Sequence, residues 1–405
     1  MILLGDGMAD YPLKELGGKT PLEFARTPHM DRITSEGTLG LVNTIPSGFS
    51  PGSDIANLSI LGYDPRKYYT GRGPLEAASQ GVQLGPDDVA FRCNLVAIGA
   101  GDAPVMEDFT SGHISSSEAR QIIDDLQREF GTAEFQFYPG VAYRHLLVWR
   151  GGKESLKTTP PHDITGRLIN DYLPQGNGSL EINSLMQRCR EILLDHPVNR
   201  LRLSEGKRPA TSIWPWGQGR APRIVSFTKK YHLTGGIISA VDLLNGIGVL
   251  AGLEVIHVEG ATGYTDTNYL GKAEKALEAL RKLDFVFVHV EAPDEMGHEG
   301  NIEGKIRAIE DFDEKVVGAV LRGLNSLAPF RLMVLSDHPT PITMRTHSPE
   351  PSPFAVQSSI AGENRKNALT FGETSARDMG ILISPGYLLM DAFIKNWRGE
   401  GKLIE

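Results

Sequence analysis

Short apolar segments that read as buried strands alternate with longer helix-like segments after Pro222. The expected strands are 223–227, 254–258, 284–290 and 331–336, and the expected helices are 236–252, 268–283 and 303–324. A similar short strand, 1–4, opens the chain. This alternation is typical of a parallel sheet with helices on both faces, because parallel strands need a crossover connection. It predicts an α/β fold with a mostly parallel sheet built from both ends of the chain.

The middle of the chain has a different pattern. Expected strands at 89–98, 134–138 and 143–149 are interleaved with expected helices at 115–130 and 180–195. This order favours an inserted α+β domain with its own core, and the Pro- and Gly-rich stretch 209–222 reads as a hinge at its end. A chain of 405 residues is also long for one core. We therefore expect a discontinuous domain, 1–85 with 218–405, and an inserted domain, 86–217.

Charge and composition narrow the class of protein. A net charge of −9 argues against a nucleic-acid binder but allows a local cationic pocket for a small anion. Cys93 and Cys189 are the only cysteines, which favours a reducing cytoplasm. The first residues lack the features of a signal peptide, and the apolar stretch 233–256 contains Asp242 and Asn245, so no membrane span is expected. The oligomeric state is not readable from the sequence.

Metal-ligand side chains gather at the expected strand ends. They are Asp6 after the first strand, Asp294 and His298 after 284–290, and Asp337, His338 and His347 after 331–336. Each motif alone is more often a turn or a surface feature. Together, three Asp and three His at one sheet edge favour a site for Zn, Mn or a similar ion.

Ser53 precedes an expected helix and follows Gly52. It is either a helix cap or a nucleophile, and the helix N-terminus would suit a phosphate on its hydroxyl. The neighbouring segment 48–52 matches the G-x-S-x-G pattern of serine hydrolases. That mechanism needs a backbone N–H after the serine, and Pro51 has none.

Several polar and charged residues outside the metal motifs could bind an acidic substrate. They are Arg72, His113, Arg144, His162, Asp163 and Arg167. Arginine pairs well with phosphate and carboxylate oxygens, although ordinary surface charge is the alternative for each. No P-loop and no dinucleotide fingerprint is found in the sequence.

The motifs that carry this chemistry resemble the alkaline phosphatase superfamily, and within it the archaeal-type cofactor-independent phosphoglycerate mutases. The matching stretches run over nearly the whole chain and include LLGDGMAD, SPGSDIANLSILGYDP, TGRGPLEAAS, PHDITG, GATGYTDTNYLGKA, HVEAPDEMGHEG and SDHPTP. The resemblance implies an alkaline-phosphatase-like sheet with an inserted domain that binds substrate.

The resemblance also implies roles for individual residues. Ser53 would be the phosphorylated nucleophile, assisted by Lys230. Two divalent ions (Mn, Zn, Co or Mg) would be held, one by Asp294, His298 and His347, the other by Asp6, Ser53, Asp337 and His338. The implied activity is the interconversion of 3- and 2-phosphoglycerate, a small phosphorylated acid, through a phosphoserine.

Three other functions stay open at this point. Some relatives of this type are thought to act as homoserine kinases, with the same metal and serine motifs. A metal-dependent phosphatase would result if water reached the phosphoserine. A non-catalytic metal- or phosphate-binding protein is the alternative from another class, although the nucleophile and every ligand are present.

Overall fold

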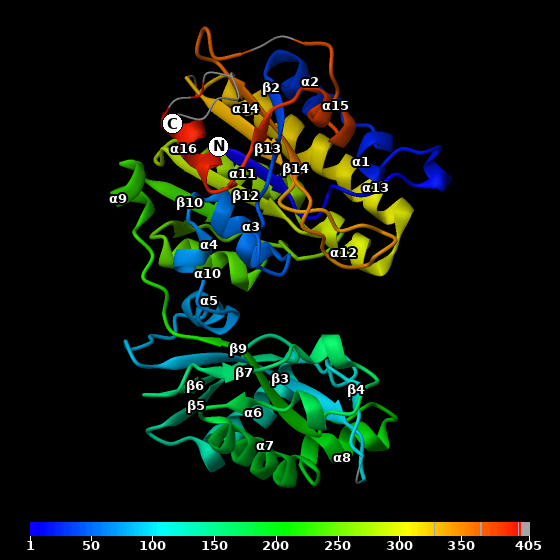
Figure 1. Cartoon of the computed structure of the whole chain (residues 1–405), viewed down its shortest axis with the longest axis vertical. Helices are drawn as coiled ribbons and strands as arrows, with labels where there is room; N and C mark the ends of the chain where they lie inside the picture. The colour runs from blue at the N-terminus through cyan, green and yellow to red at the C-terminus, as the bar shows by residue number, and fades with distance from the viewer. Residues whose placement is uncertain (102, 328, 365–366, 396, 398–405) are drawn as a thin grey trace. The chain divides into compact units, whose positions relative to one another are not determined.

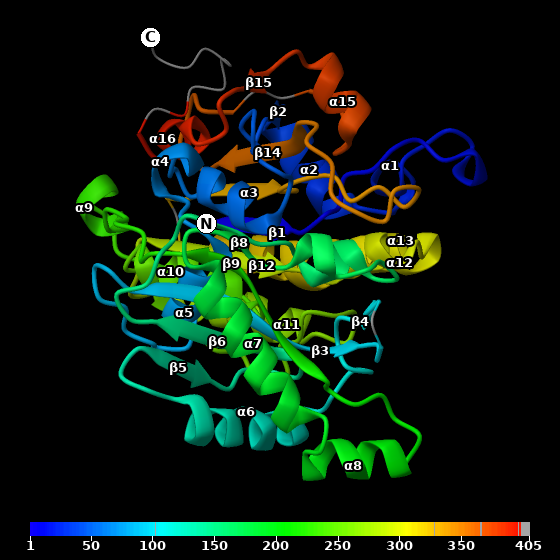
Figure 2. The ribbon, with the colours of Figure 1, turned by 60° about the horizontal axis from the view of Figure 1, so that its bottom comes forward.

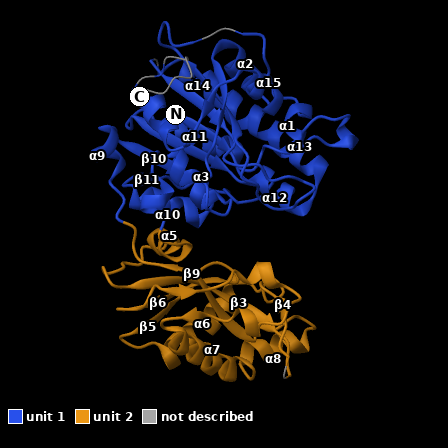
Figure 3. Cartoon of the chain, in the orientation of Figure 1, with its two compact units in different colours: residues 1–69, 223–405 blue, residues 70–222 orange. Residues whose placement is uncertain are grey.

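The computed structural model describes residues 1–101, 103–327, 329–364, 367–395 and 397. The chain divides into two compact units (Figure 3). The first unit contains residues 1–69 and 223–405, and the second contains residues 70–222. This division differs from the boundaries expected at 85 and 217. Helix α5 (Arg72–Ser79) belongs to the second unit because it packs on that unit's sheet, where Gly73 lies directly against the carbonyl of Ala90.

The described residues of the first unit form an eight-stranded sheet with the order β11-β10-β12-β1-β13-β14-β2-β15. The strands are β1 Ile2–Gly5, β2 Thr38–Val42, β10 Gly235–Ile238, β11 Glu254–Val255, β12 Phe285–Val290, β13 Arg331–Leu335, β14 Ser352–Ser358 and β15 Leu382–Ile383. Only β14 runs antiparallel to its neighbours within this set. The expected mostly parallel α/β sheet is confirmed.

Helices cover both faces of this sheet (Figures 1 and 2). One face packs on α2 (Pro28–Glu36), α11 (Tyr269–Ala279), α12 (Ala292–Glu299), α13 (Ile302–Asp311) and α14 (Gly318–Leu324). The opposite face of the sheet is covered by α3 (Ser53–Ile60) and α10 (Asp242–Leu250). Because both faces are covered, β1 and β12 are buried along their whole length. None of the described helices is long and apolar enough to cross a membrane.

Some details of the sequence prediction are wrong. The first residues of the expected helix 236–252 lie in strand β10, and the helix begins only at Asp242. The expected strand 223–227 is instead a loop followed by α9 (Phe227–Tyr231), because the Ser226 side chain accepts from the Lys229 N–H and caps a helix there. The expected hinge 209–222 contains strand β9 (Ser212–Gly219), which pairs with β3. Its Pro215 is tolerated because, among the described strands, β9 has a neighbour on one side only.

The second unit is an α+β fold with its own core. Its larger sheet contains β3 Val89–Ile98, β4 Met106–Asp108, β5 Phe135–Tyr138, β6 Arg144–Trp149 and β9. Alternate residues of β3 (Phe91, Cys93 and Leu95) pack with α6 (Ser116–Phe130) and α7 (Ser179–Leu193). Ala90 points to the opposite side of the pleat and packs toward α5 instead.

A buried ionic network lies behind the loops that follow β1 and β13. Lys305 of α13 is fully buried, and its ammonium group donates to Asp10 Oδ2 at 2.7 Å and to the Thr340 carbonyl at 2.9 Å. Glu373 accepts from the Asp10 N–H at 3.0 Å and from the Thr20 hydroxyl at 2.8 Å. The network fixes both loops to α13 and also ties the segment after β1 to α15 (Glu373–Asp378).

We predict that the free energy of unfolding falls less steeply with rising pH in Glu373→Gln than in the wild type. Burial raises the pKa of Glu373 from 4.5 to about 7. The folded state therefore binds more protons than the unfolded state between these values, and its advantage is lost as pH rises through about 7. The slope contributed by one such group is at most about 1.4 kcal/mol per pH unit.

Urea unfolding at pH 5.5 and pH 7.5 measures this slope. The exposed position Glu274 of α11 offers a matched control, because Glu274→Gln should leave the pH dependence as it is in the wild type. An equal slope in wild type and Glu373→Gln would contradict the assignment.

Candidate metal centre

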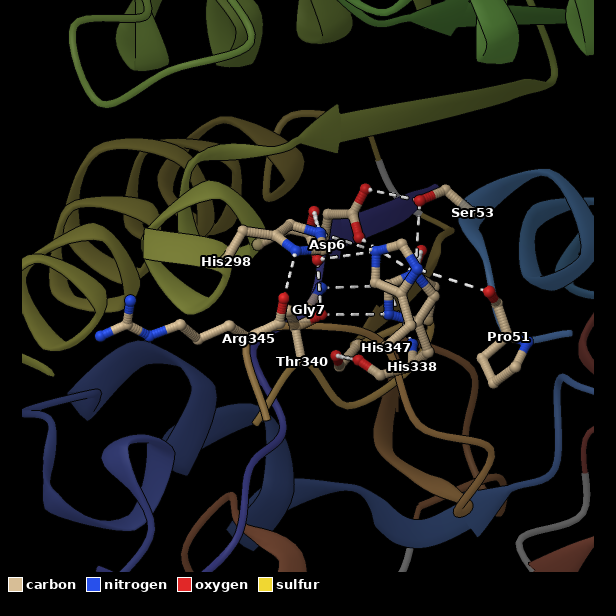
Figure 4. A network of polar contacts seen from close by, with 12 residues as sticks. Asp6, Gly7, Pro51, Ser53, His298, His338, Thr340, Arg345 and His347 are labelled. Atoms are coloured by element: carbon tan, nitrogen blue, oxygen red, sulfur yellow. Dashed lines mark hydrogen bonds and ion pairs between the residues drawn. The ribbon is translucent and has the colours of Figure 1, made fainter. Parts of the chain in front are cut away.

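The side chains expected at strand ends are brought together at one edge of the first sheet. Strands β12, β1 and β13 are adjacent and parallel, so their carboxyl ends lie side by side. Asp6 directly follows β1, Asp294 lies in the first turn of α12 after β12, and Asp337 follows β13. His347 reaches the same place from a loop, and Ser53 from the first turn of α3 (Figure 4).

The first ligand group consists of Asp294, His298 and His347. The His298 Nε2 lies 3.2 Å from Asp294 Oδ2, and the His347 Nε2 lies 3.4 Å from Asp294 Oδ1. The two Nε2 atoms are 3.0 Å apart. Asp294 and His298 share one face of α12 because they are four residues apart. One ion could contact all three side chains.

The second ligand group consists of Asp6, Asp337 and His338, with Ser53 beside it. The Ser53 hydroxyl lies 3.3 Å from Asp6 Oδ2 and 3.2 Å from His338 Nε2. The His338 Nε2 lies 3.5 Å from Asp337 Oδ2. Among the described residues, the buried Asp6 Oδ1 has no hydrogen-bond partner. A buried carboxylate oxygen that accepts no hydrogen bond is suited to binding a cation.

The electrostatics of the two groups differ. Burial, followed by the charges of Asp337 and Asp294, raises the pKa of Asp6 well above its usual range. Burial also opposes ionisation of Asp294, but hydrogen bonds and charges from His298 and His347 hold its pKa well below the usual range. Burial lowers the pKa of His298, but Asp294 outweighs it and raises the value to about 9.

Backbone carbonyls orient the two histidines of the first group. The His298 Nδ1 lies 3.0 Å from the Arg345 carbonyl, and the His347 Nδ1 lies 3.4 Å from the Pro51 carbonyl. Each Nδ1–H is thereby directed to a carbonyl, which leaves Nε2 for a metal. The donor set of carboxylates and imidazoles suits Zn²⁺, Mn²⁺ or Co²⁺, so the residues present fit the divalent ions that the sequence implied.

Some supporting residues were missed from the sequence. The His289 Nε2 lies 2.8 Å from Asp6 Oδ2, deep in β12. Asn57 donates to the Ser53 carbonyl at 2.9 Å and to Asp337 Oδ2 at 3.1 Å. The sequence signal for His289 was a polar residue in the apolar run FVFVHV. The signal for Asn57 was its spacing of one helical turn after Ser53.

Lys230 is not brought to Ser53. Helix α9 precedes β10, so it lies toward the amino ends of the parallel strands, away from the ligand groups. The Lys230 ammonium donates to the carbonyl of Gly62, beyond the far end of α3, and lies over the Tyr63 ring. This corrects the expected contact with the nucleophile, and Lys230 takes no part in the mechanism proposed below.

All six expected substrate-binding residues lie in the second unit, but they do not form one cluster. Ring contacts of 5.5–6.0 Å join Trp216, His162, Phe109 and Tyr143 in a row. The Arg72 guanidinium lies over Trp216 at one end of this aromatic row, and the Arg144 guanidinium lies over Tyr143 at the other.

The remaining three expected residues lie differently. Asp163 pairs with His162 at 3.6 Å. Arg167 contacts Tyr172, and the His113 N–H donates to Thr110. The aromatic row, in particular Trp216, was missed because its members are far apart in the sequence.

Comparison with known proteins places the chain in a family. A family model for 2,3-bisphosphoglycerate-independent phosphoglycerate mutase matches residues 34–199. A protein of Geobacter sulfurreducens, named probable 2,3-bisphosphoglycerate-independent phosphoglycerate mutase, is 54% identical over 97% of this chain and 99% of its own length. The mutase of this name from Methanosarcina barkeri is also 54% identical, over 93% of this chain and 94% of its own.

Solved structures agree with this placement. A Pyrococcus horikoshii protein has a TM-score of 0.83 at 29% identity and covers all of this chain and 98% of its own. A cofactor-independent phosphoglycerate mutase from Thermoplasma acidophilum has a TM-score of 0.63 at 26% identity, covering 97% of this chain and 98% of its own. The identity to the curated relatives over nearly full length is decisive, and the chain belongs to the family of 2,3-bisphosphoglycerate-independent phosphoglycerate mutases.

Proposed function

We propose that the protein interconverts 3-phosphoglycerate and 2-phosphoglycerate through a phosphoserine at Ser53, with two divalent ions. The observation that carries the proposal is the position of the Ser53 hydroxyl. It lies 3.3 Å from Asp6 Oδ2 and 3.2 Å from His338 Nε2, at the edge of the two ligand groups. Relatives that match nearly the full length carry the mutase name, which supports the same reaction.

The two ligand groups would hold the ions. Asp294, His298 and His347 would bind one, and Asp6, Asp337, His338 and the Ser53 oxygen the other. Bound divalent ions supply Lewis-acid charge that favours the serine alkoxide and offsets charge on phosphoryl oxygens. Mn, Zn, Co and Mg remain the candidates for these ions.

The chain's own residues would then carry out two transfers. The Ser53 hydroxyl gives up its proton, and its Oγ forms a bond to phosphorus while the phosphorus–oxygen bond to glycerate breaks and the glycerate oxygen takes up a proton. The other hydroxyl of the retained glycerate then gives up its proton and attacks phosphorus, the bond from phosphorus to Oγ breaks, and Oγ takes up a proton again. N–H groups at the start of α3 would be available to a phosphate on Ser53, the first residue of that helix. Asn57 holds the Ser53 backbone in place through both steps.

The second unit would hold the glycerate part of the substrate. Arg72 and Arg144 at the ends of the aromatic row supply cations suited to a carboxylate or phosphate. Arg92 is buried against Glu76, and Arg72 pairs with the same carboxylate at 3.0 Å but is the more exposed of the two arginines. Cys93 and Cys189 are free and buried, which is compatible with the reducing cytoplasm that we propose as the location.

The reaction itself is tested with purified protein, Mn²⁺ and 3-phosphoglycerate, without bisphosphoglycerate. We expect ³¹P NMR to record 2-phosphoglycerate, and a chelator to abolish the conversion. Parallel reactions contain homoserine with ATP, or measure free phosphate. Phosphorylated homoserine without interconversion would replace the mutase assignment with a kinase, and phosphate release alone would indicate a phosphatase.

We predict that Ser53→Ala lowers the mutase rate by about a thousandfold or more, as expected when a covalent nucleophile is removed. The variant should still bind two Mn²⁺ at saturation, because six other ligands are intact. Ser50→Ala is the matched control, since Ser50 is exposed in the loop just before α3 and should be dispensable. An active Ser53→Ala enzyme would refute the phosphoserine.

We predict that the affinity of the first group for Mn²⁺ rises with pH between 6.5 and 8.5. The pKa of His298 is raised to about 9 in the metal-free protein, so Mn²⁺ has to displace a proton from Nε2 below that pH. One such proton strengthens binding about tenfold per pH unit.

Equilibrium dialysis at three pH values measures this dependence. His298→Gln should bind Mn²⁺ more weakly and with a flatter pH profile. His113→Gln, in the second unit, should keep the wild-type profile. Affinity that is constant with pH in the wild type would contradict the linkage.

A further inference from the structure

Thr340 lies between the two ligand groups, just after β13. Its side chain is fully buried. The hydroxyl lies 2.5 Å from Asp294 Oδ1 in the first group and 3.3 Å from His338 Nδ1 in the second (Figure 4). One hydroxyl therefore contacts a ligand of each group.

The direction of these two contacts follows from counting protons. A threonine hydroxyl has one proton to donate and can also accept. A metal-ligating carboxylate has no proton, so the hydroxyl proton goes to Asp294. Toward His338 the hydroxyl can then only accept, and the proton of this contact has to be on Nδ1. The His338 Nε2 is left with its lone pair toward Ser53 and the second group.

We propose that Thr340 is a positioning residue for both proposed metal sites. Its hydroxyl orients the Asp294 carboxylate and selects the His338 ring tautomer whose Nε2 can bind a metal. A histidine ligand of this kind is usually fixed by a carboxylate or a carbonyl. In this protein the Thr340 hydroxyl fixes the His338 ring, and the same hydroxyl also contacts Asp294 of the first group.

Main-chain hydrogen bonds hold the Thr340 backbone in place. The Thr340 carbonyl accepts from the buried Lys305 ammonium at 2.9 Å, and its N–H donates to the Ala9 carbonyl at 3.1 Å. Gly7 packs so closely that a Cβ there would lie 2.5 Å from the Thr340 Oγ1. These backbone contacts persist in any side-chain variant at 340, so the hydroxyl can be tested separately from the loop.

The experiment compares wild type, Thr340→Val and Thr340→Ser in equilibrium dialysis with Mn²⁺ alone. Valine keeps the branched shape and removes the hydroxyl. Loss of such a supporting contact weakens metal binding by about 10–100-fold, and we expect that loss at both sites of Thr340→Val. Thr340→Ser restores the hydroxyl and should bind within about threefold of wild type.

Thr34→Val controls for replacing a buried threonine. Thr34 of α2 is fully buried, and within the described residues its hydroxyl has no hydrogen-bond partner. This variant should bind Mn²⁺ as the wild type does. If Thr340→Val does not fold, Thr340→Ala takes its place in the comparison with serine.

Four results would overturn the inference. Wild-type affinity in Thr340→Val or Thr340→Ala would show that the hydroxyl is dispensable. A loss at one site only would refute the link between the groups, and serine as weak as valine would assign the effect to the methyl group. The inference rests on the proposed two-metal site. Wild-type protein that binds fewer than two Mn²⁺ would refute that site directly, and mutase activity does not enter the measurement.

Discussion

The repulsion among three buried carboxylates is the constraint on which the rest of the site depends. Asp6, Asp294 and Asp337 are all placed at one sheet edge, almost without solvent. Charges that close are tolerable only with cations among them. The protein supplies part of this compensation through the histidines around Asp294. Asp6 differs: among the described residues its Oδ1 accepts no hydrogen bond and lies 3.6 Å from the His338 Nε2. The site is thus built at a cost in stability that bound divalent ions would offset.

Hydrogen bonds from neighbouring groups hold several of the ligand side chains in position. The histidines of the first group are directed by main-chain carbonyls, and Asp6 is held by His289 from the strand interior. The buried Lys305 ties the loop after β1 to the loop after β13. Rigid strand ends and a shared anchor together fix positions that free loops could not maintain.

Much of this arrangement can be predicted from the sequence, because strand ends and metal-ligand residue types both appear in local sequence patterns. The parallel sheet and the convergence of Asp6, Asp294 and Asp337 on one edge could be predicted that way. The antiparallel strand β14 was not, because its pairing with β2 depends on contacts across the chain. Lys230 was misplaced for a related reason: a motif match carries no information about which end of the sheet its helix occupies. His289 was missed although it is a polar residue in an apolar run, because its place in a strand does not show that it contacts Asp6 at the end of the neighbouring strand β1.

The order of the strands has a consequence for synthesis of the protein. Strand β1 begins at residue 2, yet both its neighbours, β12 and β13, lie beyond residue 284. On the ribosome, the first strand therefore waits unpaired until nearly the whole chain has emerged, and domains made of local sequence fold earlier. Residues 70–222 form such a continuous unit. The ligand groups consequently form late, when β12 and β13 pair with a strand that was made much earlier.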